Sequence, residues 1–199
     1  HYAEIAPKIR EKSRKKILEH LVGICGNYSP TCLVNLKERV EGYQTEAEKF
    51  QAQIENFRVW GIGLIGKLKI EGFLQNISSL EITNCGIEEL DISECVNLQE
   101  IFLANNNSLT NFNFLRQLPY PAKLKSFTVM NTIMNERTDI EIFQPFINLE
   151  VLRIKICRNL DFEKEGKTYH NSFFGSLESL KNLKKLKWLD ISDTDIDNG

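Results

Sequence analysis

The chain has 199 residues, with 25 Lys plus Arg and 27 Asp plus Glu, so its formal net charge at pH 7 is -2. Hydrophobic residues make up 42% of the sequence and charged residues 26%, a balance that excludes a disordered or collagen-like chain. The near-neutral charge argues against nucleic acid as the partner. The longest nearly uncharged apolar stretch, residues 59–66, is far shorter than the roughly 20 residues of a membrane-spanning helix, so we expect no membrane span.

Cysteine usage and the two ends of the sequence bear on where the protein works. The five cysteines are an odd number and form no C-x-x-C pair, which favours a reducing compartment over a zinc site or a redox pair. We therefore expect an intracellular, cytoplasmic protein. The sequence opens at His1 without a signal-peptide pattern, and its repeats run to Gly199 without a polar cap, so we expect a truncated piece of a larger protein.

Residues 1–60 have the pattern of a helical segment with two amphipathic helices. From Pro7 to Val22, apolar residues fall on one helical stripe and basic residues on the other side. Ser29 and Pro30 provide a cap and a first helical residue for a second helix. In that helix, apolar residues recur at alternating steps of three and four, as in a heptad seam: Leu33, Leu36, Val40, Tyr43, Ala47, Phe50, Ile54 and Phe57.

The heptad seam has two interpretations. It predicts either self-association through a helix over residues 33–57 or packing of that helix on its own chain. Tyr43, Phe50 and Phe57 are bulky for a two-stranded coiled coil, which favours packing within the chain. Gly61 ends the seam, so we expect a helical segment over 1–60 and a second domain over 61–199.

The second domain contains a repeated template, L-x-x-L-x-L-x-x-N/C/T-x-L, in five copies. Its second apolar position recurs at spacings of 21, 26, 25 and 37 residues, at Leu80, Ile101, Phe127, Leu152 and Leu189. Its polar position is occupied by Cys85, Asn106, Thr132, Cys157 and Thr194. The longest spacing contains a charged stretch from Asp161 to Gly175, which we expect to be an inserted loop.

This template resembles that of leucine-rich repeat proteins. The resemblance implies an α/β fold, a curved solenoid with a parallel sheet on its concave face, preceded here by the α-helical N-terminal segment. The sequence Leu90-Asp91-Ile92-Ser93 also resembles the short-repeat intracellular proteins of fungi and other microbes.

Stacking of the repeats follows from elementary physics as well. One coil of about twenty residues cannot cover its own apolar face, so Leu80 and Ile82 must pack on Ile101 and Leu103 of the next coil. An amide, hydroxyl or thiol at the polar position can bond backbone groups that the chain frees where it leaves the strand. We therefore expect the cysteines of the template to be structural.

The sequence supports no enzymatic chemistry and no cofactor or metal. Residues 61–66 spell G-x-G-x-x-G, but a phosphate-binding loop needs a strand before it and a helix after it, whereas the pattern here predicts the reverse order. The three histidines lie in no recognisable catalytic arrangement, and the acidic residues near the C-terminus lack the spacing of a calcium loop.

The residues that flank the inward apolar positions should point out of the concave face. Several are apolar or aromatic without serving the core, which predicts protein or peptide binding there, unless they pack on one another or under the N-terminal helices. The candidate binding residues are Glu81, Glu100, Phe102, Met130, Val151, Arg153, Lys155, Trp188 and Asp190. We expect a non-catalytic interaction module of a larger signalling, adaptor or substrate-receptor protein. The alternatives are a substrate-selecting region of a kinase or ubiquitin-ligase component, or a self-associating scaffold.

Overall fold

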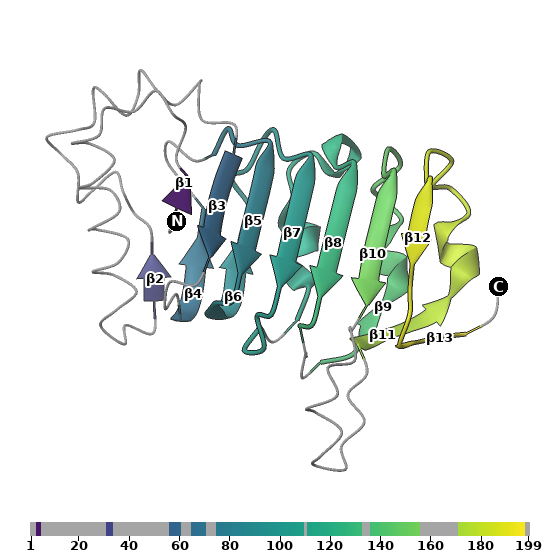
Figure 1. Ribbon diagram of the computed structural model, residues 1–199. Helices are drawn as coiled ribbons and strands as arrows, with labels where there is room; N and C mark the ends of the chain where they lie inside the picture. The colour runs from purple at the N-terminus through teal and green to yellow at the C-terminus, as the bar shows by residue number, and fades with distance from the viewer. Residues whose placement is uncertain are drawn as a thin grey trace, which may run out of the picture.

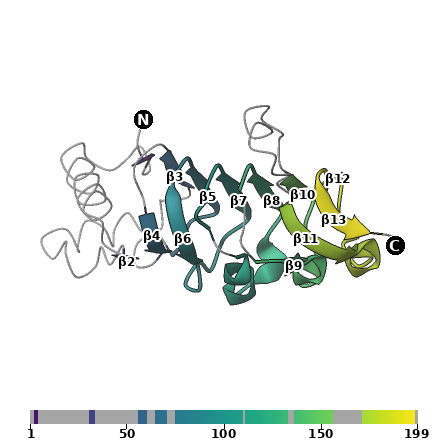
Figure 2. The ribbon, with the colours of Figure 1, turned by 90° about the horizontal axis from the view of Figure 1, so that it is seen from below.

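The computed structural model describes residues 3–4, 31–33, 56–60, 65–70, 75–109, 111–132, 136–155 and 171–197. These residues form three sheets of mostly parallel strands and four short 3-10 helices. Figure 1 shows one broad sheet in front, and Figure 2 shows the two smaller sheets and the 3-10 helices on the opposite side of the core.

The broad sheet has seven strands. Each neighbouring pair is parallel, except that β1 runs antiparallel to β3. From β3 to β12 the strands lie side by side in the order in which they occur along the chain. In sheet order they are β1 (Ala3–Glu4), β3 (Asn56–Trp60), β5 (Ser79–Thr83), β7 (Glu100–Ala104), β8 (Ser126–Met130), β10 (Val151–Lys155) and β12 (Trp188–Asp190).

The opposite side of the core is formed by shorter elements. One parallel sheet contains β2 (Thr31–Leu33), β4 (Ile65–Lys69) and β6 (Gly86–Asp91), and the other contains β9 (Thr138–Asp139), β11 (Asn171–Ser176) and β13 (Thr194–Asp197). The 3-10 helices are η3 (Asn113–Gln117), η4 (Pro121–Lys123), η5 (Ile140–Phe143) and η7 (Leu177–Leu180).

The core lies between these two sides, and alternation along the strands fills it. In β5, Leu80 and Ile82 are fully buried while their neighbours are partly exposed. The register pairs Leu80 with Ile101 and Ile82 with Leu103, which confirms the predicted packing of successive copies of the template. Aromatic rings fill the space behind the middle strands, including those of Phe112 and Phe173, stacked with centroids 4.7 Å apart.

An asparagine in the left-handed region follows each of three neighbouring strands of the seven-stranded sheet. Asn84, Asn105 and Asn131 have φ of 55°, 54° and 51°, directly after β5, β7 and β8. Asparagine tolerates this conformation better than most residues, because its short polar side chain bonds locally. The chain therefore turns out of the sheet at the same place in three successive strands.

The polar position of the template bonds the backbone, as predicted. Asn106 is fully buried; its Nδ2 donates to the Ile82 carbonyl at 2.9 Å, and its Oδ1 accepts from the Cys85 amide at 3.1 Å. The Thr132 hydroxyl accepts from the Asn106 amide at 3.4 Å, and the Thr194 hydroxyl donates to the Ile191 carbonyl at 2.7 Å. Cys157 lies outside the described residues.

The predicted α/β fold with an α-helical N-terminal segment is wrong. The described residues contain no helix of seven or more residues, and β1, β2 and β3 fall inside the range 1–60 that was predicted to be helical. Leu33 and Phe57, the first and last members of the heptad seam, lie in strands β2 and β3. Phe57 is buried and pairs in register with Leu80, so packing on a parallel neighbour decided its conformation. The rest of the seam, between the two strands, lies outside the described residues.

Two further expectations about the fold need correction. The described residues form parallel-strand sheets, but a curved solenoid is not shown. The stretch 161–175 was expected to be a loop; its last residues belong to β11, which pairs in parallel with β9 and β13 because Phe173 is buried in the core. Residues 161–170 lie outside the described part of the chain.

No helix in the described part of the chain has the length and apolar character needed to cross a membrane.

Candidate functional site

The outward side of the seven-stranded sheet, which we term the open face, carries side chains in straight rows across β3, β5, β7, β8, β10 and β12. Because the strands are parallel and in register, equivalent positions stand next to one another. The middle row consists of Arg58, Glu81, Phe102, Thr128, Arg153 and Asp190. A row on one side runs from Ser79 through Glu100, Ser126 and Val151 to Trp188, and a row on the other side contains Met130 and Lys155.

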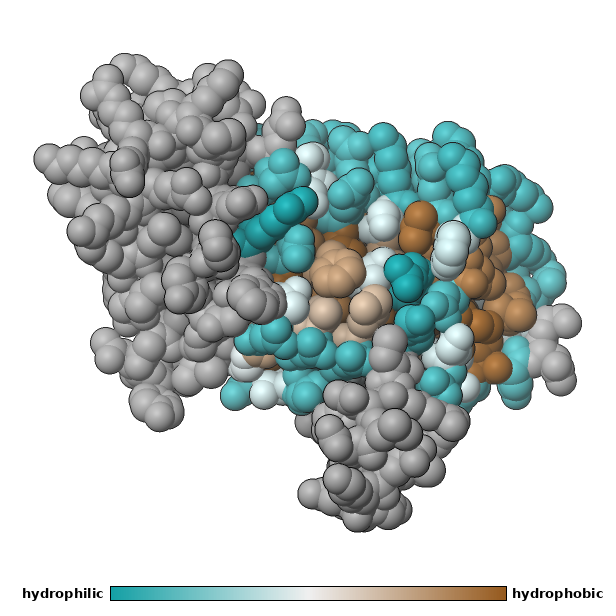
Figure 3. Space-filling model, viewed as in Figure 1, coloured by the Kyte–Doolittle hydropathy of each residue, from teal (hydrophilic) through white to brown (hydrophobic). Residues whose placement is uncertain are grey.

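All nine candidate residues lie in these rows. Glu81, Phe102, Arg153 and Asp190 belong to the middle row. Their exposure varies along the face: Trp188 is 59% exposed, whereas Phe102 and Val151 are only partly exposed. The predicted residues thus lie on one side of the sheet. Figure 3 views the molecule from this side and shows a surface that mixes apolar and hydrophilic side chains.

Charged and aromatic side chains gather at the β10 and β12 end of the open face. The Arg153 guanidinium lies over the Trp188 ring, 6.0 Å from its centroid. Asp190 Oδ2 lies 3.3 Å from Lys155 Nζ and 3.9 Å from Arg153 Nε. The contact between Asp190 and Arg153 Nε is an ion pair, because 3.9 Å is too long for a hydrogen bond. Arg153 Nε is therefore buried without a hydrogen-bond partner in the described part of the protein.

Asp190 is ionised in this cluster. Burial by itself would raise the pKa of Asp190, but hydrogen bonds from the Ser192 hydroxyl and amide, together with Lys155, lower it below its ordinary value of 3.8. One carboxylate therefore balances part of the charge of two basic side chains, and this end of the face retains net positive charge.

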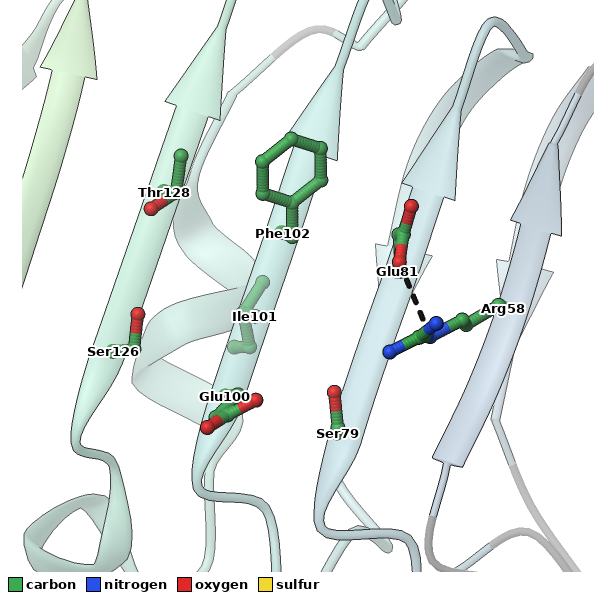
Figure 4. Close-up of a pocket in the computed structure, with 8 residues that line it drawn as sticks. All are labelled: Arg58, Ser79, Glu81, Glu100, Ile101, Phe102, Ser126 and Thr128. Atoms are coloured by element: carbon green, nitrogen blue, oxygen red, sulfur yellow. Dashed lines mark ion pairs between the residues drawn. The ribbon is translucent and has the colours of Figure 1, made fainter.

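A pocket of about 230 Å³ lies at the other end of the open face (Figure 4). Strands β3, β5, β7 and β8 supply its lining residues: Arg58, Ser79, Glu81, Glu100, Ile101, Phe102, Ser126 and Thr128. The Phe102 ring stands up from β7, with Glu81 on one neighbouring strand and Thr128 on the other.

The charges in this pocket do not cancel. Arg58 Nε forms an ion pair with Glu81 Oε2 at 3.2 Å, shown as a dashed line in Figure 4. Glu100 is exposed and forms no ion pair with any described residue. The pocket therefore holds one uncompensated negative charge beside an aromatic ring.

Sequence reasoning missed Arg58 as a member of this face. The residue was assigned to the end of a helix, although the alternation of Phe57, Arg58 and Val59 also fits a strand with Arg58 pointing outward. Ser79, Ser126 and Thr128 were expected to point outward but were not chosen as binding residues, because small hydroxyl side chains give no signal of their own. Only the register brings them around Phe102.

Among the described residues, no group of three His, Cys, Asp or Glu side chains could hold a metal ion. A scan against protein-family models finds no match, and a search of curated proteins finds no similar sequence. The chemistry of the open face is therefore the basis for a functional assignment.

Proposed function

We propose that this chain is a non-catalytic recognition module that binds a protein or peptide on the open face. The observation that carries the proposal is the alignment, on one exposed sheet surface, of aromatic, apolar and charged side chains that contribute nothing to the core. Binding sites for proteins concentrate such residues, and tryptophan and arginine dominate their energetics.

Trp188 and Arg153 are the central pair of this surface. An exposed tryptophan costs solubility without stabilising the fold, and here it lies under a guanidinium whose Nε has no hydrogen-bond partner in the described residues. A partner that covers both side chains would bury the Trp188 ring and would offer acceptors to the outer N–H groups of the Arg153 guanidinium, whose side chain is 33% exposed. The resemblance of the template to leucine-rich repeats also supports a recognition role. The odd number of cysteines in the sequence and the lack of a C-x-x-C pair support a place in the cytoplasm.

The test is affinity capture from native cell extract, with bound proteins identified by mass spectrometry. The bait is the chain itself, compared with its Arg153→Glu, Trp188→Ala variant. The matched control is Tyr120→Ala, Lys184→Glu, because both residues are exposed and lie in segments between the strands of the open face. We expect one set of partners to bind the chain and the control variant and to be lost from the face variant.

Folding must be measured on the same samples. Circular dichroism and melting temperature should be nearly the same for the three proteins, because none of the four side chains belongs to the core. If the face variant retains its partners, recognition takes place elsewhere and the proposal is wrong. If it loses both partners and folded structure, Arg153 and Trp188 are structural residues and the proposal is equally wrong.

A further inference from the structure

We infer that the pocket around Phe102 binds the side chain of an arginine in the partner polypeptide. This inference rests on the proposed function, and it specifies the chemistry of one contact that the partner must make. It follows from the shape, the charge and the hydrogen-bonding capacity of the pocket.

Phe102 supplies an aromatic surface of suitable size. Its ring lines the pocket and is only partly buried, while the neighbouring Ile101 and Leu103 are buried in the core. A guanidinium group is planar and stacks on an aromatic face, where the ring quadrupole attracts its charge. The hollow above β7 thus fits a flat cation.

The uncompensated charge of the pocket has the sign that a cation requires. Arg58 already neutralises Glu81, which leaves Glu100 as the free carboxylate. A partner arginine would pair with Glu100 through two parallel hydrogen bonds, a geometry that the guanidinium fork favours. An acidic side chain would be repelled here, and an apolar side chain would leave the Glu100 charge partly desolvated and unpaired.

Three hydroxyl groups complete the site. Ser79, Ser126 and Thr128 line the pocket, and their side-chain hydroxyl groups form no hydrogen bond with another described residue. Thr128 is only 5% exposed, so its hydroxyl can reach few partners other than a group that enters the pocket. Arginine has five N–H donors, of which two can bond Glu100 and others can bond these hydroxyl oxygens. The three donors of a lysine ammonium cannot also stack as a plane on Phe102.

The opposite end of the open face cannot take the same side chain. Asp190 is already engaged by Lys155, and Arg153 lies close by, so a further cation would meet net positive charge. The arginine of the partner is thereby placed over β5, β7 and β8.

The direct test is a titration of the chain with N-acetyl-arginine-N-methylamide, followed by ¹H–¹⁵N NMR. We expect shift changes at Phe102 and Thr128, and about 5- to 20-fold weaker binding by the Glu100→Gln variant, as for the loss of one charge-assisted hydrogen bond. The Glu136→Gln variant is the matched control, because Glu136 is exposed and lies outside the seven-stranded sheet. The citrulline and lysine derivatives should bind more weakly than the arginine derivative. Equal binding of arginine and citrulline derivatives, or an unchanged affinity of Glu100→Gln, would overturn the inference.

A second experiment separates this inference from the proposed function. Peptides are selected on the full chain from a phage-displayed library of random dodecapeptides. Enriched arginine together with loss of binding to Glu100→Gln supports both proposals. Peptides that Glu100→Gln still binds but that Arg153→Glu, Trp188→Ala does not bind would overturn the arginine pocket and leave the open face as the binding site. Peptides unaffected by either variant, or a library without any selected peptide, would overturn both.

Discussion

The backbone amide of Cys85 donates a hydrogen bond to the side chain of Asn106, which lies 21 residues further along the chain. The side-chain nitrogen of Asn106 in turn donates a hydrogen bond to the Ile82 carbonyl. One buried side chain therefore bonds the backbone both before and after the point where the chain leaves β5. Asn106 thereby couples its copy of the template to the preceding one, and Thr132 does the same by accepting a hydrogen bond from the Asn106 amide. The stack therefore depends on buried hydrogen bonds as well as on apolar packing.

Replacement of Asn106 by alanine should destabilise the protein strongly. It removes two buried hydrogen bonds, to the Ile82 carbonyl and from the Cys85 amide, which should lower the free energy of unfolding by about 2–4 kcal/mol. The exposed neighbour Asn107 is the control, and Asn107→Ala should change stability by less than about 0.5 kcal/mol. Urea unfolding followed by circular dichroism measures both. Equal losses of stability in the two variants would show that the hydrogen bonds of Asn106 make no net contribution to the free energy of unfolding.

The same substitution at equivalent template positions should have different effects along the stack. Leu152 is fully buried between β8 and β12, whereas Leu189 in the end strand β12 is 41% exposed. Leu152→Ala should lower the free energy of unfolding by about 2–5 kcal/mol. Leu189→Ala should lower it less, because the lost side chain buries less apolar area and leaves no closed cavity. Comparison of the two urea midpoints checks this, and a larger effect at Leu189 would contradict it.

Gly175 is required by its conformation and by its surroundings. Its φ is +108°, and a Cβ at this position would lie 2.7 Å from Asp139 Oδ1, the oxygen that caps η5 by accepting from the Glu141 amide. Gly175→Ala should destabilise the protein by about 1–3 kcal/mol. In a double-mutant cycle with Asp139→Ala, part of that loss should disappear because the clash is removed while the strained φ remains. Strict additivity of the two changes would contradict the predicted contact.

The ionisation of Asp190 makes stability depend on acid pH. Its pKa is lowered in the folded protein, so its contribution is complete above the unfolded value and is lost as pH falls through the folded value. An NMR titration of the Asp190 carboxyl carbon should therefore give a midpoint below 3.8. Ser192→Ala removes one of its hydrogen bonds and should raise that midpoint. A midpoint at or above 3.8 in the unaltered protein would contradict the prediction.

Cys95 should be unreactive in the folded protein. Burial first, and then the charges of Asp91 and Glu94, raise the pKa of its thiol from 9.0 to about 12. The thiolate is the form that alkylates, and a thiol with this raised pKa holds very little of it at pH 8. Peptide-resolved mass spectrometry after iodoacetamide treatment should show Cys95 labelled slowly in buffer and rapidly in urea. Equal rates would show that the side chain is accessible.

The apolar template predicted the packing of the middle of the chain because its signal is repeated. Leu80, Ile101 and Phe127 are buried at equivalent positions of three neighbouring strands. The alternation of inward and outward side chains around such positions placed every candidate binding residue on one face of the sheet. The same logic failed near the N-terminus. Short apolar runs such as the one around Phe57 fit a helix and a strand equally well, and the neighbouring β5 decides between them.

The binding pocket illustrates another limit of sequence reasoning. Glu100 and Phe102 were predicted because their side chains have obvious chemistry, but Ser79 and Thr128 became part of the site only through the register of three strands. Arg58, more than twenty residues earlier in the chain, determines which carboxylate is neutralised: it pairs with Glu81 and leaves Glu100 without an ion pair among the described residues. Pairing between distant charges cannot be read from local spacing.

The order of the strands also determines how the molecule responds to mechanical force. From β3 to β12 the strands lie in chain order, with these two at opposite ends of the series (Figure 1). Tension between the two ends acts across the strands, along their inter-strand hydrogen bonds, so these bonds are loaded a few at a time. Because each strand contacts mainly its immediate neighbours, the sheet should unravel from an end, one strand after another, at low force. Such a protein would lengthen gradually under tension and would not rupture in one event.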